Sequence, residues 1–245
     1  MTAKVRLFVD HPLGEGQQVP LSREQAHYLF GVMRLGQGAY VALFNSRDGE
    51  WLAKVAEAGK RGGTLVAQTQ TKPLQMPPDL WLLFAPIKKA RTDFIVEKAA
   101  EMGACRIVPV ITEYTNSARV ARDRLQAHAV EAAEQCGGTF VPEVAEVARL
   151  DRVMADWDAG RMIMFCDERD AGNDGMPSLA QFAGGAAPWA ILIGPEGGFS
   201  ERDRRCVAAH ADSVLNVSLG PRILRADTAA VAAMTLWQTT LGDWP

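Results

Sequence analysis

The chain has 245 residues, with 26 Lys and Arg against 29 Asp and Glu and a formal net charge of −3. A chain of this length can bury the core of one large domain, or of a small domain joined to a medium one. Its apolar fraction of 48% and charged fraction of 22% argue against a disordered chain, and its slight negative charge excludes a surface coated with positive charge for indiscriminate nucleic-acid binding.

Membrane and metal proteins are disfavoured by the distribution of particular residues. The sequence has no run of about 18 uncharged apolar residues, and Asp10 and Pro12 interrupt the N-terminal stretch before a signal-peptide core could form. We therefore expect a cytoplasmic protein without a membrane partner. The cysteines lie far apart, with no C-x-x-C pair and no histidine at metal-ligand spacing, which predicts reduced, mostly buried thiols and no metal. They are Cys105, Cys136, Cys166 and Cys206.

The first region of the chain predicts a short helix followed by strands. Ser22 and Gln25 have the spacing of a capping box at the start of a helix that ends near Gly36. The apolar side of that helix consists of Ala26, Leu29, Phe30 and Met33. Three β-type runs follow at 39–44, 50–55 and 64–70, separated by Gly, Asn and Asp. This pattern indicates a small β-barrel or meander.

A proline-rich stretch, TKPLQMPPD, separates this region from the rest of the chain. Pro73, Pro77 and Pro78 are unfavourable in a helix interior or a central strand, so the stretch indicates a linker. We therefore predict a small domain at 1–72, a linker at 73–79 and a larger domain at 80–245.

In the larger domain, buried-strand patterns alternate with helical patterns. The predicted strands are 80–85, 106–110, 161–167, 189–194 and 213–219, and the predicted helices are 92–102, 119–136, 200–210 and 227–241. Uninterrupted apolar strands that alternate with helices are typical of a mostly parallel sheet covered on both faces. The larger domain is therefore predicted to be α/β.

The most informative segment is ILIGPEGGFSERD, residues 191–203, where an apolar strand meets a glycine-rich loop. Glycines at the carboxyl end of a parallel strand allow the backbone to approach a ligand. Ser200 and Asp203 can cap the helix that follows. The spacing matches neither a Walker loop nor a Rossmann fingerprint, so the loop favours a cofactor pocket or, alternatively, an ordinary turn between strand and helix.

The segment SLGPRILRADTAA, residues 218–230, repeats this strand–glycine–helix arrangement. Arg225 stands where it could bind an anionic group or a developing oxyanion, with an ion pair to Glu196 or Asp227 as the alternative. Asp227 is also well placed as a helix N-cap. Basic residues gather at His27 and Arg34, in the run Lys88, Lys89 and Arg91, and at Arg119, Arg122 and Arg124. Several such clusters on an acidic chain favour selective phosphate contacts.

With these residues in view, the chain resembles the RsmE family of ribosomal small-subunit RNA (uracil-N3) methyltransferases, within the SPOUT superfamily. The resemblance covers nearly the whole length. It rests on RLFVD, HYLFGVMRLGQGAYVALFNSRDGEW, KKARTDFIVEKAAEMGACRIVPVITEYT, EAAEQCGGTFVPEV, IGPEGGFSERD and SLGPRILRADTAA.

This resemblance implies a PUA-like N-terminal barrel for RNA recognition and a C-terminal domain tied in a trefoil knot, in a homodimer that acts on 16S ribosomal RNA of the small subunit. It also implies that S-adenosylmethionine binds in the knot loops. The cofactor-binding residues would be Ile193, Gly194, Glu196, Gly197, Gly198, Leu219, Gly220, Ile223, Leu224, Arg225 and Thr228. Gly138 stands where the family pattern has an arginine, whereas Asp203 and Asp227 keep a carboxylate at positions where glutamate is common.

Methylation of a uracil ring requires the N3–H to lose its proton, which suggests two catalytic roles. Arg225 is the candidate to stabilise the uracil oxyanion, and Glu196 is the candidate proton acceptor. His27, Arg34, Lys88, Lys89 and Arg91 are the candidate RNA contacts. Two other functions fit the same motifs: a SPOUT enzyme that methylates the ribose 2′-oxygen, and a non-catalytic RNA-binding module.

Overall fold

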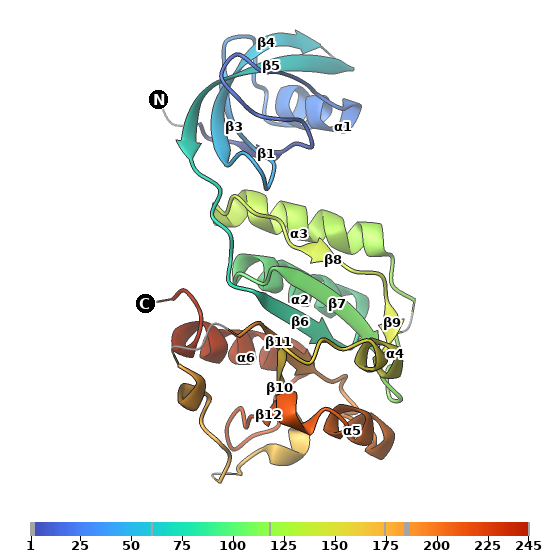
Figure 1. Cartoon of the computed structure of the whole chain (residues 1–245). Coiled ribbons are helices and arrows are strands. Elements are labelled where there is room, and N and C mark those ends of the chain that lie inside the picture. The colour runs from blue at the N-terminus through green and yellow to red at the C-terminus, as the bar shows by residue number, and fades with distance from the viewer. Residues whose placement is uncertain (1–2, 60, 118, 174, 184–186, 245) are drawn as a thin grey trace. The chain divides into compact units, whose positions relative to one another are not determined.

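The chain divides into two compact units (Figure 1). The computed structural model describes residues 3–59, 61–117, 119–173, 175–183 and 187–244. One unit contains residues 1–76 and 133–141, and the other contains 77–132 and 142–245. Each unit is described separately below.

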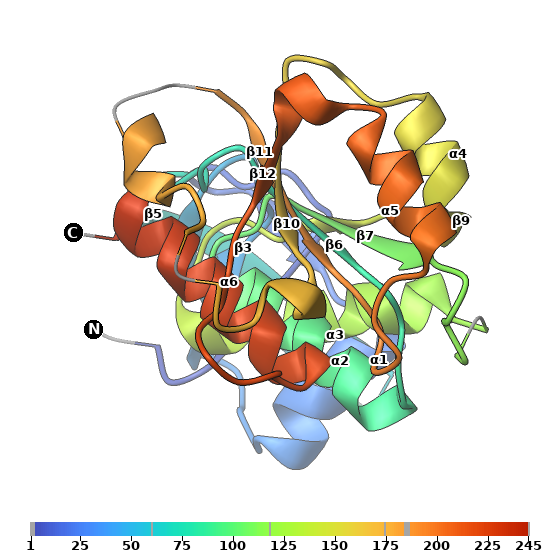
Figure 2. The ribbon, with the colours of Figure 1, turned by 90° about the horizontal axis from the view of Figure 1, so that it is seen from below.

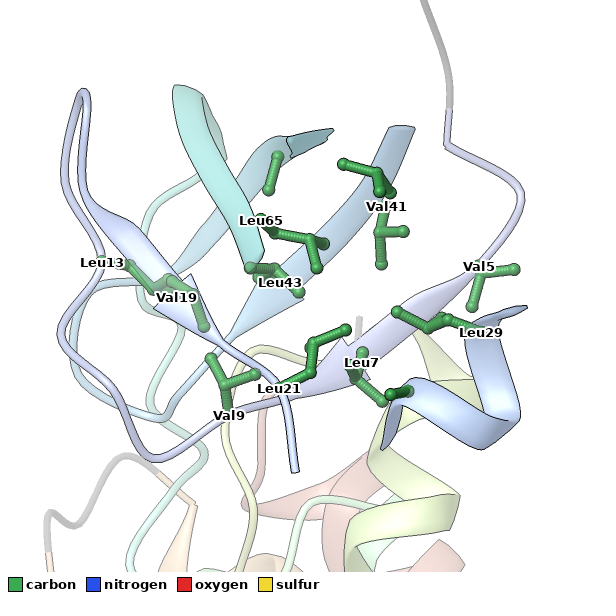
Figure 3. Packing of buried hydrophobic residues seen from close by; sticks show 13 residues of the cluster. Val5, Leu7, Val9, Leu13, Val19, Leu21, Leu29, Val41, Leu43 and Leu65 are labelled. Atoms are coloured by element: carbon green, nitrogen blue, oxygen red, sulfur yellow. The ribbon is translucent and has the colours of Figure 1, made fainter. Parts of the chain in front are cut away.

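The first unit is built on a strongly curved five-stranded sheet. Its strands are β1 (Arg6–Phe8), β2 (Gln18–Pro20), β3 (Tyr40–Phe44), β4 (Glu50–Gly59) and β5 (Gly62–Lys72), in the order β1-β3-β4-β5-β2. β1 and β3 are parallel and the other pairs are antiparallel. Register shifts between β4 and β5 bend the sheet around an apolar interior. That interior includes Leu7, Val19, Leu29, Leu43 and Leu65 (Figure 3).

The helix of the first unit begins as predicted and ends earlier than predicted. Ser22 Oγ accepts a hydrogen bond from the Gln25 amide at 3.1 Å, and Gln25 Oε1 accepts one from the Ser22 amide at 3.0 Å. This capping box starts α1 (Arg23–Ala26), which widens into the π-helical turn η1 (His27–Val32). The helix does not continue to Gly36, because Arg34 adopts a left-handed backbone with a φ of 55°.

The second unit contains the predicted parallel sheet. Its strands are β6 (Leu80–Phe84), β7 (Arg106–Ile111), β8 (Glu143–Val144), β9 (Ala148–Arg149), β10 (Met162–Cys166), β11 (Trp189–Ile193) and β12 (Val214–Asn216). The order is β12-β10-β11-β6-β7-β8, β9 pairs with β7, and every pair is parallel. The side chains of β11 are buried along its whole length, as expected for a central strand covered on both faces.

Helices cover both faces of this sheet (Figure 2). They are α2 (Lys89–Glu101), α3 (Arg122–Cys136), α4 (Leu150–Ala155), α5 (Glu201–Ala208) and α6 (Ala226–Thr240), with 3₁₀ turns η2 (Glu168–Asp170), η3 (Leu179–Phe182) and η4 (Ala211–Ser213). α4 and α5 lie together on one face, and Met154 and Val207 from these helices share a core with the sheet residues Ile163 and Leu192. α2 and α6 cover the other face, where Gln238 donates to the Met102 carbonyl at 2.7 Å.

The start of α6 differs from the prediction. The helix begins at Ala226 with Arg225 in the N-cap position, so Asp227 lies in the first turn and is not the cap. Its carboxylate is instead 3.6 Å from the Arg91 guanidinium. Within the described residues, no helix combines the length and the apolar character needed to cross a membrane.

Candidate active site

Three neighbouring strands of the second unit direct their carboxyl ends toward one cavity. The loops after β10, β11 and β12 line a space of about 200 Å³. In open parallel sheets, ligands bind outside the carboxyl ends of the strands. The two glycine-bearing loops at Gly194 and Gly220, which are far apart in the sequence, therefore meet at the position where this fold binds small molecules.

The glycines in these loops are required by close approaches or by a left-handed backbone. A Cβ atom at Gly194 would lie 2.8 Å from the ring of Phe199. At Gly198, where φ is +68°, a Cβ atom would overlap the carboxylate of Glu168. Gly220 has a φ of +105°, and its carbonyl accepts a hydrogen bond from the Gly172 amide at 3.0 Å. The loops therefore present backbone rather than side chains to parts of the cavity wall.

Most residues predicted to bind the cofactor line this cavity. They are Ile193, Gly194, Glu196, Gly197, Gly198, Leu219, Gly220, Ile223 and Leu224. Arg225 and Thr228 are exposed and do not belong to the lining, whereas Arg222 does. The assignments of all these residues as cofactor contacts, and of Arg225 and Glu196 as catalytic groups, stay predictions.

The structure adds an acidic pair to the cavity wall that sequence reasoning missed. Asp167 and Glu168 follow β10 directly and both line the cavity. Arg204 of α5 donates to both Asp167 oxygens at 2.5 and 2.9 Å and to Glu168 Oε1 at 2.7 Å. The segment FCDERD carried a signal for this pair, because carboxylates at the carboxyl end of a parallel strand belong to the ligand-binding edge.

Burial and charge shift the titration of this cluster in opposite directions. Burial raises the pKa of Glu168, and the neighbouring Asp167 raises it further. Burial also opposes ionisation of Asp167, but the hydrogen bonds from Arg204 and the Arg169 amide outweigh it and hold the pKa of Asp167 below its ordinary value. The hydrogen bond to Asp167 raises the pKa of Arg204. One guanidinium therefore compensates one carboxylate well and the other poorly.

The helix after the β11 loop is fixed by the predicted capping box. Ser200 Oγ accepts from the Asp203 amide at 3.1 Å, and Asp203 Oδ2 accepts from the Ser200 amide at 3.0 Å. Both residues are buried. This box holds the start of α5, and hence Arg204, against the cavity wall.

The cysteines differ in part from the prediction. All four are free thiols, but Cys136 is exposed and the others are only half-buried. Cys166 lines the cavity, and burial raises its pKa to about 12. Burial likewise raises the pKa of Cys105 to about 11. Both remain protonated near neutral pH and are poor nucleophiles.

The predicted basic clusters of the second unit meet around a different cavity. Lys89, Arg119 and Arg124 line a space of about 620 Å³ next to the start of α2. Lys88 is exposed at the N-cap of α2. Arg91 lies near Asp227 and is half-buried. In the first unit, His27 and Arg34 are exposed.

The glycine that stands where the family pattern has an arginine, Gly138, also lies in the first unit. Gly138 has a carbonyl that accepts a hydrogen bond from Arg6 Nη2 at 2.5 Å. A Cβ atom there would meet only Cys136 Sγ at 3.4 Å and the Phe140 carbonyl at 3.9 Å. A side chain at this position would therefore fit, so the glycine is not imposed by lack of space.

The structure resembles solved methyltransferases over its full length. A protein from Legionella pneumophila, described as a methyltransferase in complex with bound S-adenosylmethionine, is 26% identical with a TM-score of 0.87, covering 99% of this chain and 100% of that one. Ribosomal RNA small subunit methyltransferase E from Neisseria gonorrhoeae, solved with S-adenosylmethionine, has a TM-score of 0.86 at 23% identity, covering 98% and 99%. The predicted fold class, a PUA-like barrel before a mostly parallel SPOUT-type α/β domain, is confirmed; the trefoil knot stays a prediction.

Sequence comparisons agree with the structural ones. Ribosomal RNA small subunit methyltransferase E from Rickettsia conorii is 26% identical over 230 residues, which is 94% of this chain and 93% of that protein. An RNA methyltransferase PUA domain matches residues 21–68, and an RNA methyltransferase domain matches residues 74–238. Because the second match covers well over half of the chain, the protein belongs to the RNA methyltransferase domain family.

Proposed function

We propose that this protein uses S-adenosylmethionine to methylate N3 of a uridine in 16S ribosomal RNA of the small subunit. The observation that carries the proposal is the convergence of the β10, β11 and β12 loops on one cavity, in a chain that belongs to the RNA methyltransferase domain family. The matching relatives from Rickettsia and Neisseria bear the name of a small-subunit ribosomal RNA methyltransferase. When bound, the cofactor supplies an electrophilic methyl group on a sulfonium.

The residues around the cavity fit such a cofactor. Ile193, Leu219 and Leu224 provide apolar surface, while Glu168 and Glu196 provide acceptors for hydroxyl or cationic groups. A volume of about 200 Å³ encloses only part of the cofactor, since closed sites for drug-sized ligands begin at about 300 Å³. The remainder would extend past Ile223, which lines the cavity although 73% of its surface is exposed.

The chemistry assigned to this chain is removal of the N3 proton from the uracil and stabilisation of the negative charge that remains on the base. Glu196 lines the cavity and is exposed, so its carboxylate can accept the N3 proton and exchange it with solvent. Arg225 stabilises the oxyanion left on the base. Holding the deprotonated ring in line with the methyl carbon provides the rest of the rate acceleration.

RNA binding is assigned to four exposed cations and to the half-buried Arg91. Lys88 and Lys89 at the start of α2, together with Arg91, contact phosphates of the ribosomal RNA, as do His27 and Arg34 in the barrel. The chain acts as a homodimer. The exposed apolar side chains of Ile223 and Leu236 support this assignment, because a second copy would remove them from water.

Labelled S-adenosylmethionine and undermethylated small ribosomal subunits test the proposal directly. We expect one labelled nucleoside that co-elutes with 3-methyluridine, and reverse transcription locates it in the RNA. A 2′-O-methylated nucleoside would instead indicate the ribose-methylating alternative. No label and no heat of cofactor binding would indicate a non-catalytic RNA-binding module.

Variants of Arg225 and Arg222 test the role of the arginine. Arg225→Ala should lower kcat about 100-fold while leaving cofactor affinity unchanged. Arg222→Ala is the matched control, since Arg222 lines the cavity without an assigned catalytic role. Full turnover by Arg225→Ala would transfer the oxyanion role to another group.

Glu196→Gln tests the role of the proton acceptor. It should lower kcat and flatten the acid limb of the pH–rate profile.

A further inference from the structure

The Glu168 carboxylate contacts groups on two sides. Its Oε1 accepts from Arg204 Nη2 at 2.7 Å on one side, and on the other its carboxylate occupies the space that a Cβ atom on Gly198 would take. Gly198 belongs to the loop after β11 and Glu168 to the loop after β10, so the carboxylate sits between two walls of the cavity. Its side chain is 32% exposed, which leaves one face accessible.

The ion-paired groups around Glu168 carry more negative than positive charge. Arg204 also binds Asp167, whose side chain is only 6% exposed, so a single guanidinium serves two carboxylates on the cavity wall. Glu201 is 3.8 Å from Arg204, but it has its own partner in Arg169. The raised pKa of Glu168 reflects the same shortage of positive charge. A cation in the cavity would supply the missing charge.

We propose that Glu168 is a positioning residue that recognises the positive charge of the cofactor's sulfonium, and so distinguishes the methyl donor from its uncharged thioether product. This inference rests on the proposed use of S-adenosylmethionine. Donor and product share the adenosine, the carboxylate and the ammonium, and they differ only at the sulfur, which is cationic before transfer and neutral after it. A fixed carboxylate in a partly desolvated wall favours the cationic form and lets the neutral product leave.

The cavity lining also contains the carboxylates of Asp167 and Glu196. Both oxygens of Asp167 already accept hydrogen bonds from Arg204. Of the remaining two carboxylates, Glu168 fits this role better than Glu196. Glu196 is exposed, so water screens its field. Glu168 is half-buried and oriented by Arg204 and Gly198, and its interactions are therefore stronger over the same distance. Because the sulfonium charge disappears during transfer, such a carboxylate stabilises the bound donor more than the transition state.

Calorimetry with three ligands tests the inference. The ligands are S-adenosylmethionine, S-adenosylhomocysteine, and sinefungin, in which a protonated amine replaces the methylated sulfonium. Glu168→Gln keeps the shape and removes the charge. We expect about a tenfold loss of affinity for the two cationic ligands and less than about a twofold change for the neutral one. The KM for the donor should rise and kcat should rise with it, because the bound donor loses more stabilisation than the transition state.

Glu201→Gln is the matched control, since it removes a carboxylate from the same Arg204 cluster without touching the cavity lining. It should bind all three ligands like the wild type, and thermal unfolding should show that both variants are folded. An equal loss for all three ligands, or no loss for any, in Glu168→Gln would overturn the role of Glu168 alone. A wild-type protein that binds none of the ligands would overturn the proposed function together with this inference.

Discussion

Arg6 in the first unit and Arg204 in the second are both mostly buried and pair with acidic side chains, but they differ in how completely their surroundings are neutralised. In the first unit, Arg6 donates to Glu50 at 2.7 Å and to three backbone carbonyls, and it stacks over the Phe44 ring at 4.5 Å. In the second unit, Arg204 must serve both Asp167 and Glu168. The first arrangement is complete in itself, whereas the second leaves negative charge facing a cavity.

The pKa values of the acidic partners express this difference. Burial opposes ionisation of Glu50, but hydrogen bonds from Arg6 and Thr71 outweigh it and lower the pKa. For Glu168, burial and the neighbouring Asp167 outweigh Arg204, and the pKa is raised. Removing one partner of a satisfied buried ion pair destabilises a fold, while an unsatisfied charge beside a cavity indicates a ligand. We therefore expect mutations at Arg6 to affect folding and mutations around Glu168 to affect binding.

The largest expected effect is on the stability of the first unit. Arg6→Ala leaves the Glu50 carboxylate buried without its main partner, since that side chain is only 8% exposed. Loss of one member of such a pair costs about 3–5 kcal/mol of unfolding free energy. Urea unfolding followed by circular dichroism measures it.

The double variant Arg6→Ala with Glu50→Gln is the control for this prediction. It removes the orphaned charge, so its loss of stability should be smaller than that of Arg6→Ala alone. A loss below about 1 kcal/mol for Arg6→Ala would mean that the Arg6 cluster is as replaceable as an exposed ion pair, and the distinction between the two clusters would fail.

The next effect concerns binding in the second unit. Gly198→Ala requires a side chain at a left-handed backbone and places its Cβ atom on the Glu168 carboxylate. We expect the affinity for S-adenosylmethionine to fall at least tenfold, because the carboxylate and the β11 loop must both move. Calorimetry on the folded variant measures this change.

A double-mutant cycle sharpens the assignment. Glu168→Ala with Gly198→Ala removes the overlapping carboxylate, so the two losses should not add. Additive losses would show that Gly198 matters only through its backbone conformation. In that case the contact between the β10 and β11 loops would have no part in cofactor binding.

The sequence predicted the frame of this site well, for a clear physical reason. The apolar runs at 80–85 and 189–194 form the neighbouring strands β6 and β11, and the carboxyl end of β11 carries glycines that line the cavity. Such runs are set by local composition and by burial on both faces of a sheet. The strands β8 and β9 were not predicted, because two residues each are too few to show a pattern.

The charged half of the site was harder to predict, because it depends on tertiary pairing. Arg204 lies in the run SERDRR, which is typical of a solvated helix face, yet it binds Asp167 from a strand end 37 positions earlier. Arg225, by contrast, occupies a loop with the right pattern but is exposed and does not belong to the cavity lining. Spacing identifies which loops meet, and only packing decides which side chains enter the space between them.

A smaller effect is expected on the pH dependence of folding. Because the folded pKa of Glu50 is lowered from 4.5, its ionised form stabilises the first unit fully above that value, and this contribution is lost as the pH falls through the folded pKa. Glu50→Gln should therefore show a shallower loss of stability than the wild type below about pH 4.5. Urea unfolding at pH 3–6 measures this; parallel curves would mean that Glu50 gains nothing from Arg6.

The smallest expected effect concerns a cation, Lys89, whose charge is not neutralised by an ion pair within the described residues. Lys89 lines the cavity next to the start of α2 together with Arg119 and Arg124. Lys98, on the same helix, is 2.6 Å from Glu101. An unpaired cation that binds a phosphate releases counterions, so Lys89→Gln should reduce the salt slope of RNA binding by about 0.7–0.9. Lys98→Gln, the matched control, should leave the slope unchanged because its charge is already compensated. Equal salt slopes for both variants would mean that the start of α2 does not contact the RNA backbone. An unneutralised charge would then identify a ligand site only where the charged group is a carboxylate.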